Sequence, residues 1–175
     1  TIPDSVTAIG HEAFSYCSSI TRVTIPDSVT AIGDEAFYNC SKLASITIPA
    51  KVTTIGDNAL FLCHALEEIT IPDSVTSIGQ SAISSCNNLM QFKGKFASPD
   101  GRCLIVNGRL VSFAPAGVVS YTIPDGVTSI DKQAFYAGRG GLASVVIPDS
   151  VSKIGQWAFS ETPTLTDVII GSGVT

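Results

Sequence analysis

The feature that most constrains this sequence is a motif of about 23 residues that recurs along nearly the whole chain. In its second occurrence it reads Ile-Pro-Asp-Ser-Val-Thr-x-Ile-Gly-x-x-Ala-Phe-x-x-Cys-x-x-Leu. The motif begins at Ile2, Ile25, Ile48, Ile71, Ile123, Ile147 and Ile170. A fixed period in this range indicates a solenoid of stacked coils rather than a compact domain. Solenoids present extended surfaces, so their function depends on variable surface residues more than on the repeated ones.

Composition excludes several classes of function. Apolar residues make up 45% of the 175 residues and charged residues 14%, which supplies ample material for a core. No apolar run approaches the roughly 18 residues that span a bilayer, so we expect no membrane insertion by this segment. The formal net charge is −5 and no basic cluster is present, so we expect no nucleic-acid partner.

The ends of the sequence carry no recognisable processing signal. No signal peptide or lipidation motif is visible, and neither end shows the polar capping repeat that solenoids usually need. We therefore interpret residues 1–175 as one solenoid that is a fragment of a longer array.

Each coil is predicted to contain a strand, a turn, a short strand and a short helix. Counting the Ile of Ile-Pro as coil position 1, apolar residues recur at positions 1, 5, 8, 12, 13, 16, 19 and 22. Residues 43–48 alternate in the manner of a strand, which the following proline ends. Pro-Asp-Ser is turn chemistry, in which the Asp and Ser side chains can bond nearby backbone amides. Asp34 is a candidate N-cap for a brief helix that carries Ala36, Phe37 and Cys40.

With the motif laid out, the chain resembles the BspA-like leucine-rich-repeat surface proteins. The matching residues of the second coil are Ile25 to Thr30, Ile32-Gly33, Ala36-Phe37, Cys40 and Leu43. The resemblance implies an α/β leucine-rich-repeat solenoid, a secreted or cell-surface location, and roles in adhesion or host interaction. Departures such as Leu60 and Ile83 in place of Phe are changes that a packed coil can absorb.

The repeat is interrupted between Ile71 and Ile123, which are 52 residues apart: one coil of 23 and a divergent unit of 29. Asn107-Gly108 between two apolar runs predicts a β-hairpin, because both turn positions need positive φ. This turn would pair Ile105 with Leu110 and Leu104 with Val111, and residues 95–97 would add a third strand. We thus divide the solenoid into repeat blocks 1–93 and 123–175 and a divergent hairpin unit 94–122. A hairpin apolar on both faces is either covered by the solenoid or offered to a partner, and we favour the first. The smaller irregularity at residues 139–141 is interpreted as a surface insertion.

The cysteines form the most regular constellation. Cys17, Cys40, Cys63 and Cys86 recur at the coil period. Equivalent positions of successive coils point the same way, which suits neither tetrahedral metal binding nor disulfide geometry. We interpret them as a row of small buried thiols. Cys103 lies outside the row and is the better candidate for a reactive thiol.

No arrangement of residues predicts catalysis or a cofactor. Asp4, Asp27, Asp73, Asp125 and Asp149 form a second row, but turn capping explains them better than calcium binding does. His11 and His64 occupy different coil positions, so stacking does not bring them together. Nucleophile elbows, phosphate-binding loops and zinc motifs are missing from the sequence. We therefore expect no metal, no cofactor and no enzymatic activity.

Function is expected to depend on the outward positions of the main strands, coil positions 21 and 23. Position 21 varies from coil to coil while the rest of the motif is nearly constant. The candidate ligand-binding residues on this predicted concave face are Arg22, Ser45, Glu68, Gln91, Lys93, Ser144 and Asp167. The face carries no aromatic anchor of the kind that marks a binding hot spot.

Two functional hypotheses follow. The first is a secreted or cell-surface binding or adhesion module that engages a protein or glycan, such as a host or matrix protein, through its concave sheet. The second is a structural spacer that stiffens a longer surface protein while another domain binds. The sequence leaves the ligand, the number of further repeats and the oligomeric state open.

Overall fold

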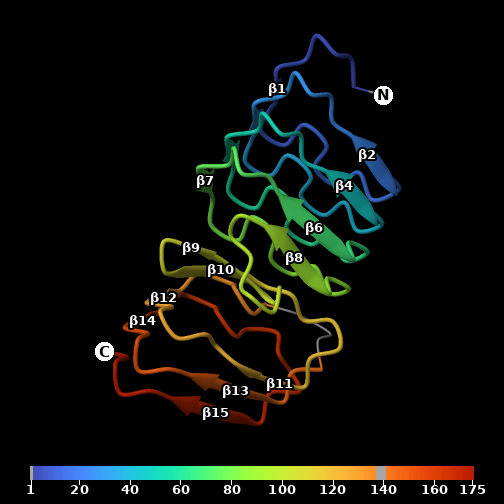
Figure 1. Ribbon diagram of the computed structural model, residues 1–175. Coiled ribbons are helices and arrows are strands. Elements are labelled where there is room, and N and C mark those ends of the chain that lie inside the picture. Colours follow the sequence, from blue (N-terminus) through green and yellow to red (C-terminus); the bar gives the residue numbers. More distant parts are fainter. Residues whose placement is uncertain (1, 137–140) are drawn as a thin grey trace.

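The computed structural model describes residues 2–136 and 141–175, in which the chain winds from one end of an elongated body to the other (Figure 1). These residues form short strands joined by turns. The repeats of the sequence are successive coils of a solenoid, as the period predicts. Residues 139 and 140 of the predicted surface insertion lie outside the described residues.

In the N-terminal block, each coil contributes two strands to two ladders. The short Thr-x-Ile segments give β1 (Ala8–Ile9), β3 (Ala31–Ile32), β5 (Thr54–Ile55) and β7 (Ser77–Ile78), which form one parallel sheet. The longer segments give β2 (Arg22–Thr24) paired with β4 (Ser45–Thr47), and β6 (Glu68–Ile71) paired with β8 (Gln91–Gly94). Partners such as Ile9 and Ile32 are 23 residues apart, so the sheet register reproduces the sequence period.

The C-terminal block repeats this arrangement. The strands β11 (Ser120–Thr122), β13 (Ser144–Ile147) and β15 (Asp167–Ile170) form a parallel sheet. The other ladder runs β14 (Lys153–Ile154), β12 (Ser129–Ile130), β10 (Arg109–Phe113) and β9 (Cys103–Val106). The hairpin strands β9 and β10 therefore extend the short-strand ladder of the second block.

The predicted short helix of each coil is wrong. Among the described residues the solenoid contains no helix, and the segment from position 10 to position 16 is a series of turns. The chain cannot continue as a helix here, because the residues at positions 11 and 15 have left-handed φ values of 53° to 64°. These residues are Glu12, Glu35, Asn58, Ser81, Gln133 and Trp157 at position 11, and Tyr16, Asn39, Leu62, Ser85 and Glu161 at position 15.

Left-handed residues redirect every second N–H group towards the next coil. The N–H of Glu12 donates to Asp34 O (3.0 Å) and that of Phe14 to Ala36 O (2.8 Å), whereas the intervening Ala13 N–H bonds Gly10 in its own coil. A short helix would leave the N–H groups of its first turn without partners in the helix. Here half of the N–H groups of the segment join neighbouring coils, which offsets the strain of non-glycine residues in the left-handed region.

The divergent unit forms the predicted hairpin with one irregularity. Ile105 pairs with Leu110 as expected, but Leu104 pairs with Ser112 because the register shifts after Leu110. Val111 is the extra residue of this bulge, so its predicted pairing with Leu104 is wrong. The third strand is reduced to a single antiparallel bridge between Ala97 and Leu104.

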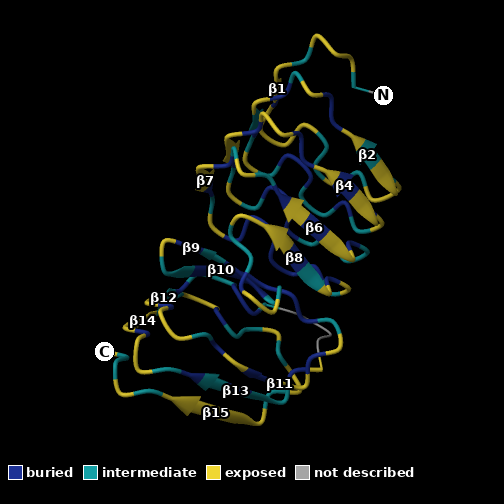
Figure 2. Cartoon of the chain, in the orientation of Figure 1, coloured by how far each residue is buried: buried dark blue, intermediate teal, exposed yellow. Residues whose placement is uncertain are grey.

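The core runs through the centre of both blocks, and exposed residues lie on the outside of the coils (Figure 2). It consists of two clusters. The hairpin contributes Leu104 and Val111 to the first cluster and Cys103, Leu110 and Phe113 to the second. The solenoid thus covers both faces of the hairpin. Leu60 and Ile83 are fully buried where other coils have Phe, so these departures are absorbed by packing.

Candidate binding surface on the main strands

The main strands present a row of outward side chains, which we call the strand face: the first and third residues of β2, β4, β6, β8, β11, β13 and β15. The alternation of a strand places neighbouring side chains on opposite faces. In β4, for example, Ile46 is buried while Ser45 and Thr47 are exposed. The repeated apolar residue at position 22 therefore fixes which residues face outward.

Five of the predicted site residues lie together in the N-terminal block. Arg22 pairs in register with Ser45, and Glu68 with Gln91. Lys93 Nζ donates to Glu68 Oε2 at 2.7 Å, and Gln91 Nε2 donates to the same oxygen at 3.3 Å. The Lys93 hydrogen bond and charge lower the pKa of Glu68. Glu68, Gln91 and Lys93 thus form one hydrogen-bonded cluster on an otherwise mostly neutral sheet.

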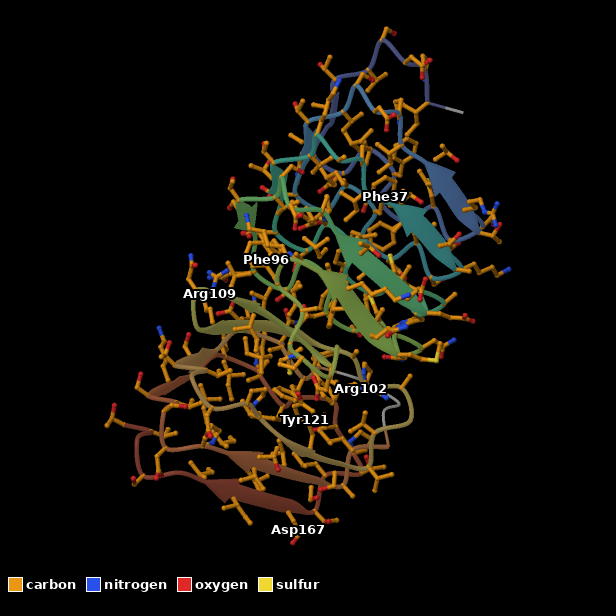
Figure 3. The ribbon with its side chains drawn as sticks, viewed as in Figure 1. Phe37, Phe96, Arg102, Arg109, Tyr121 and Asp167 are labelled. Atoms are coloured by element: carbon orange, nitrogen blue, oxygen red, sulfur yellow. The ribbon has the colours of Figure 1, made fainter. Side chains whose placement is uncertain are left out.

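The other two predicted residues lie in the C-terminal block, on a separate sheet. Ser144 pairs in register with Asp167 and donates a hydrogen bond to Ser120 Oγ at 2.7 Å. Asp167 lies on the last strand, at the C-terminal end of the solenoid (Figure 3). Next to it, Ile169 is 64% exposed and adds an apolar element to the face. The structure therefore divides the seven residues between the two blocks, and the five of the N-terminal block lie on two separate strand pairs, β2–β4 and β6–β8.

The cysteine row is a packing device. Cys40, Cys63 and Cys86 are buried, and each thiol donates to a carbonyl of the preceding coil, as from Cys40 Sγ to Phe14 O at 3.1 Å. Burial raises the pKa of Cys40 to about 11 and that of Cys86 to about 12. All five cysteines are free thiols.

The prediction that Cys103 is the more reactive thiol is wrong. Cys103 is fully buried in the hairpin, where its Sγ donates to Tyr121 Oη at 3.3 Å. Burial raises its pKa to about 12. Although Cys103 is not part of the regular repeat, its thiol is not exposed, because the solenoid covers both faces of the hairpin. Cys17 is the partly exposed cysteine.

Asp34 and the two histidines have partners in neighbouring coils, whereas of the predicted row of aspartates Asp149 is the one, in the described part of the chain, whose carboxylate accepts hydrogen bonds, from Ser172 N–H at 2.6 Å and Ser172 Oγ at 3.1 Å. Asp34 does not cap a helix: its Oδ1 accepts the N–H of Asp57 in the next coil at 2.8 Å. In the Pro-Asp-Ser turn, Ser28 donates across to Val6 O in the preceding coil at 2.6 Å rather than within its own turn. The imidazole Nδ1 of His11 lies 3.1 Å from Asp34 O, and that of His64 lies 2.9 Å from Ser85 O. No group of three potential metal ligands occurs among the described residues.

Sequence reasoning missed a hydrogen-bond network behind the hairpin. Tyr121 Oη donates to Asp100 Oδ2 at 3.0 Å, and Ser98 Oγ donates to Asp100 Oδ1 at 2.5 Å. Burial acts to raise the pKa of Asp100, but hydrogen bonds from Ser98, the Arg102 backbone and Tyr121 lower it overall. One signal was available. Tyr121 occupies the inward position 22, mostly aliphatic in other coils, and a buried phenol needs a polar partner.

Stacked coils with a two-residue strand on one side and a longer parallel strand on the other define a β-solenoid of the leucine-rich-repeat class. The sequence model of the BspA type leucine rich repeat region matches the chain in six copies, over residues 1–97 and 111–175. The chain belongs to this family. The unmatched residues 98–110 all lie within the hairpin unit.

Solved structures agree with this assignment. A leucine rich cell surface protein from Faecalibacterium prausnitzii is 35% identical, with a TM-score of 0.83 over 98% of this chain. A leucine rich repeat protein from T. pallidum is 29% identical over 94% of this chain, with a TM-score of 0.53. A leucine-rich repeat protein from Eubacterium ventriosum, 22% identical over 94% of this chain with a TM-score of 0.64, shares the fold.

The chain spans 47%, 63% and 57% of these three proteins, so it corresponds to about half of the first. No curated protein matches it significantly. Within the described residues, no helix is long and apolar enough to cross a membrane.

Proposed function

We propose that the chain is a secreted or cell-surface binding module that engages a protein or glycan partner through the strand face. The observation that carries this proposal is the contrast between constant inward residues and variable outward ones on the same strands. Position 22 is aliphatic or aromatic in every coil, while position 21 changes from Arg22 to Ser45, Glu68 and Gln91 along the N-terminal block. Burial accounts for the first pattern and leaves the second without a structural cause.

The surface location is supported by similarity. The protein from Faecalibacterium prausnitzii is described as a leucine rich cell surface protein, and it covers nearly all of this chain. A solenoid on a cell surface offers a long row of side chains at regular spacing, which suits an extended partner. Charged points such as Arg22 and Asp167 would then fix orientation and partner choice more than raw affinity.

The test is a capture experiment with immobilised matrix proteins and glycans. Arg22→Ala, Glu68→Ala, Lys93→Ala and Asp167→Ala combined should abolish capture, because they remove the charges of both blocks' strand faces. A matched control changes Lys42 and Lys51, which lie outside the strand face, and should capture normally. Capture that survives the fourfold change would refute binding by this face. Failure of the unmodified protein to retain any partner would favour a structural spacer.

A further inference from the structure

A polar groove lies where the two repeat blocks meet, on the side of the short-strand ladders. It consists of two hollows of about 360 and 480 Å³ that share Arg109 and Ser129. Figure 3 shows Arg109 at the edge of the molecule between the blocks. The first hollow is lined by β7 and the hairpin tip, the second by β12 and β14. The remaining lining residues that matter here are Asn107, Gln80, Asp131, Lys132, Lys153 and Gln156.

The groove concentrates positive charge in an acidic protein. The chain has ten Lys and Arg residues against fifteen Asp and Glu, yet Arg109, Lys132 and Lys153 line this one site. Arg109 Nε lies 3.4 Å from Asp131 Oδ2, so these two charges compensate each other. With three cations and one carboxylate, the lining has a formal charge of 3 − 1 = +2. Asp57 is outside the lining, but its Oδ1 accepts the N–H of Gln80 at 2.7 Å, so its carboxylate lies beside the site and lowers the local formal charge to 2 − 1 = +1.

Packing holds Arg109 and Asp131 of this groove in place. Asp131 is largely buried, its side chain being 11% exposed. Burial raises its pKa, and the nearby Arg109 and Lys153 oppose that shift. Arg109 also donates from Nη2 to Ile78 O of β7 at 3.0 Å, which joins the two blocks across the groove floor. The ion pair of Arg109 and Asp131 is therefore preformed, and the two lysines lie beside it.

An exposed tryptophan stands beside the lysines. The Lys132 ammonium lies over the Trp157 ring at 5.2 Å from its centroid, and Trp157 is 55% exposed. Its coil position, 11, is polar in the other coils: Glu12, Glu35, Asn58, Ser81 and Gln133. Core packing therefore does not require an indole here. A large exposed aromatic next to a polar groove is an informative exception to the usual burial pattern.

We propose that this groove binds a carboxylated saccharide, such as a chain of uronic acid residues. Its lysines would receive the carboxylates in charge-assisted hydrogen bonds. Its amides and hydroxyls would pair with sugar hydroxyls, and the exposed indole surface would pack on the C–H face of a pyranose ring. The site lies apart from the strand face, and it does not rest on the function proposed for that face.

Two other polyanions fit the groove less well. Nucleic acid carries one charge per phosphate and needs a broad basic surface, which a protein of net charge −5 does not offer. An acidic peptide presents its charges on mobile side chains and has few hydroxyls for Gln80, Gln156 and Asn107. A uronate chain has one carboxylate per ring, which suits the two well-separated lysines, and several hydroxyls, which suit the amide side chains of the lining.

The test is calorimetric titration with a short oligogalacturonate at low ionic strength. The matched ligand is the same oligosaccharide with its carboxylates methyl-esterified, and a third ligand is oligoglutamate. We expect the uronate to bind at least about tenfold more tightly than either, and its affinity to fall with added salt. Equal binding of the neutral ester, tighter binding of oligoglutamate, or no uronate binding would each overturn the proposal.

Variants locate the site on the protein. Lys132→Gln and Lys153→Gln should each weaken uronate binding by about tenfold, since each removes one charge-assisted contact. Trp157→Ala should weaken it by roughly fivefold. Lys51→Gln, an exposed lysine of the N-terminal block, is the matched control and should change nothing. Loss of binding on the fourfold strand-face change, with these three variants unaffected, would place the saccharide on the strand face and overturn the groove assignment.

Discussion

The regular coils of residues 2–93 and the hairpin unit bury their apolar side chains by different means. In the coils, each apolar face is covered by an equivalent face, as where Phe37 stacks on Phe14 with ring centroids 5.3 Å apart. In the hairpin the two faces meet different cores: Val111 belongs to the first cluster and Leu110 to the second. A coil is therefore interchangeable with its neighbours, whereas the hairpin is a specific joint between two blocks.

Truncating Phe113, an aromatic side chain of the hairpin, should have the largest effect on stability. Phe113 is buried between Phe135 and Tyr121, with ring centroids 4.6 and 4.8 Å away. Phe113→Ala should lower the free energy of unfolding by about 3–5 kcal/mol, measured by urea denaturation. Amide exchange should quicken first in residues 118–175 of the described chain. Phe14→Ala, at a half-buried position with one stacking partner, is the control and should cost less. Equal losses would mean that the joint is energetically no different from a coil.

Measuring thiol reactivity compares the coils with the hairpin in the unmodified sequence. Burial raises the pKa of Cys86 in a coil and of Cys103 in the hairpin to about 12. At pH 9, about three units lower, the native thiolate fraction should be about a thousandfold below that of an unperturbed thiol. Alkylation followed by mass spectrometry should therefore modify Cys17 first. Because both folded-state pKa values lie above the unfolded ones, stability should fall as the pH rises from about 9 towards 12. Early modification of Cys103 alone would show that the hairpin opens independently of the coils.

A glycine substitution tests how closely the coils stack. A Cβ atom on Gly56 would lie 2.5 Å from Asp34 N and 2.6 Å from Gly33 C, both backbone atoms of the preceding coil. Gly56→Ala should therefore destabilise the protein by about 1–3 kcal/mol through overpacking, measured by thermal unfolding. Gly10 holds the same coil position, but a Cβ there meets no atom within 4 Å. Gly10→Ala should leave stability nearly unchanged; a loss like that of Gly56→Ala would mean that close stacking is not the cause.

Much of this architecture could be predicted from the period, because burial and strand alternation act locally. The 23-residue spacing fixed the strand register, and Asn107-Gly108 located the hairpin. The turn region could not be predicted. Ala36, Phe37 and Cys40 have helical spacing, and only inter-coil hydrogen bonds favour the left-handed alternative. The sequence did not predict the groove, because Arg109 and Lys153 are 44 residues apart and line the same site only once the hairpin has paired with the second block.

The smallest expected effect on stability comes from the identity of the residues with left-handed φ, which differs between the hairpin tip and the coil turns. The hairpin tip places Asn107 and Gly108 at positive φ, residues that tolerate it, whereas the second coil places Glu35 there at φ 55°. The third coil has Asn58 at the equivalent position, with φ 53°. Glu35→Asn should therefore stabilise the protein by about 0.5 kcal/mol, since Asn reduces the left-handed strain. The reverse change, Asn58→Glu, should destabilise it by a similar amount in urea denaturation at high salt, which screens the altered charge. If both changes were neutral, inter-coil hydrogen bonds rather than residue identity would set the conformation of this turn.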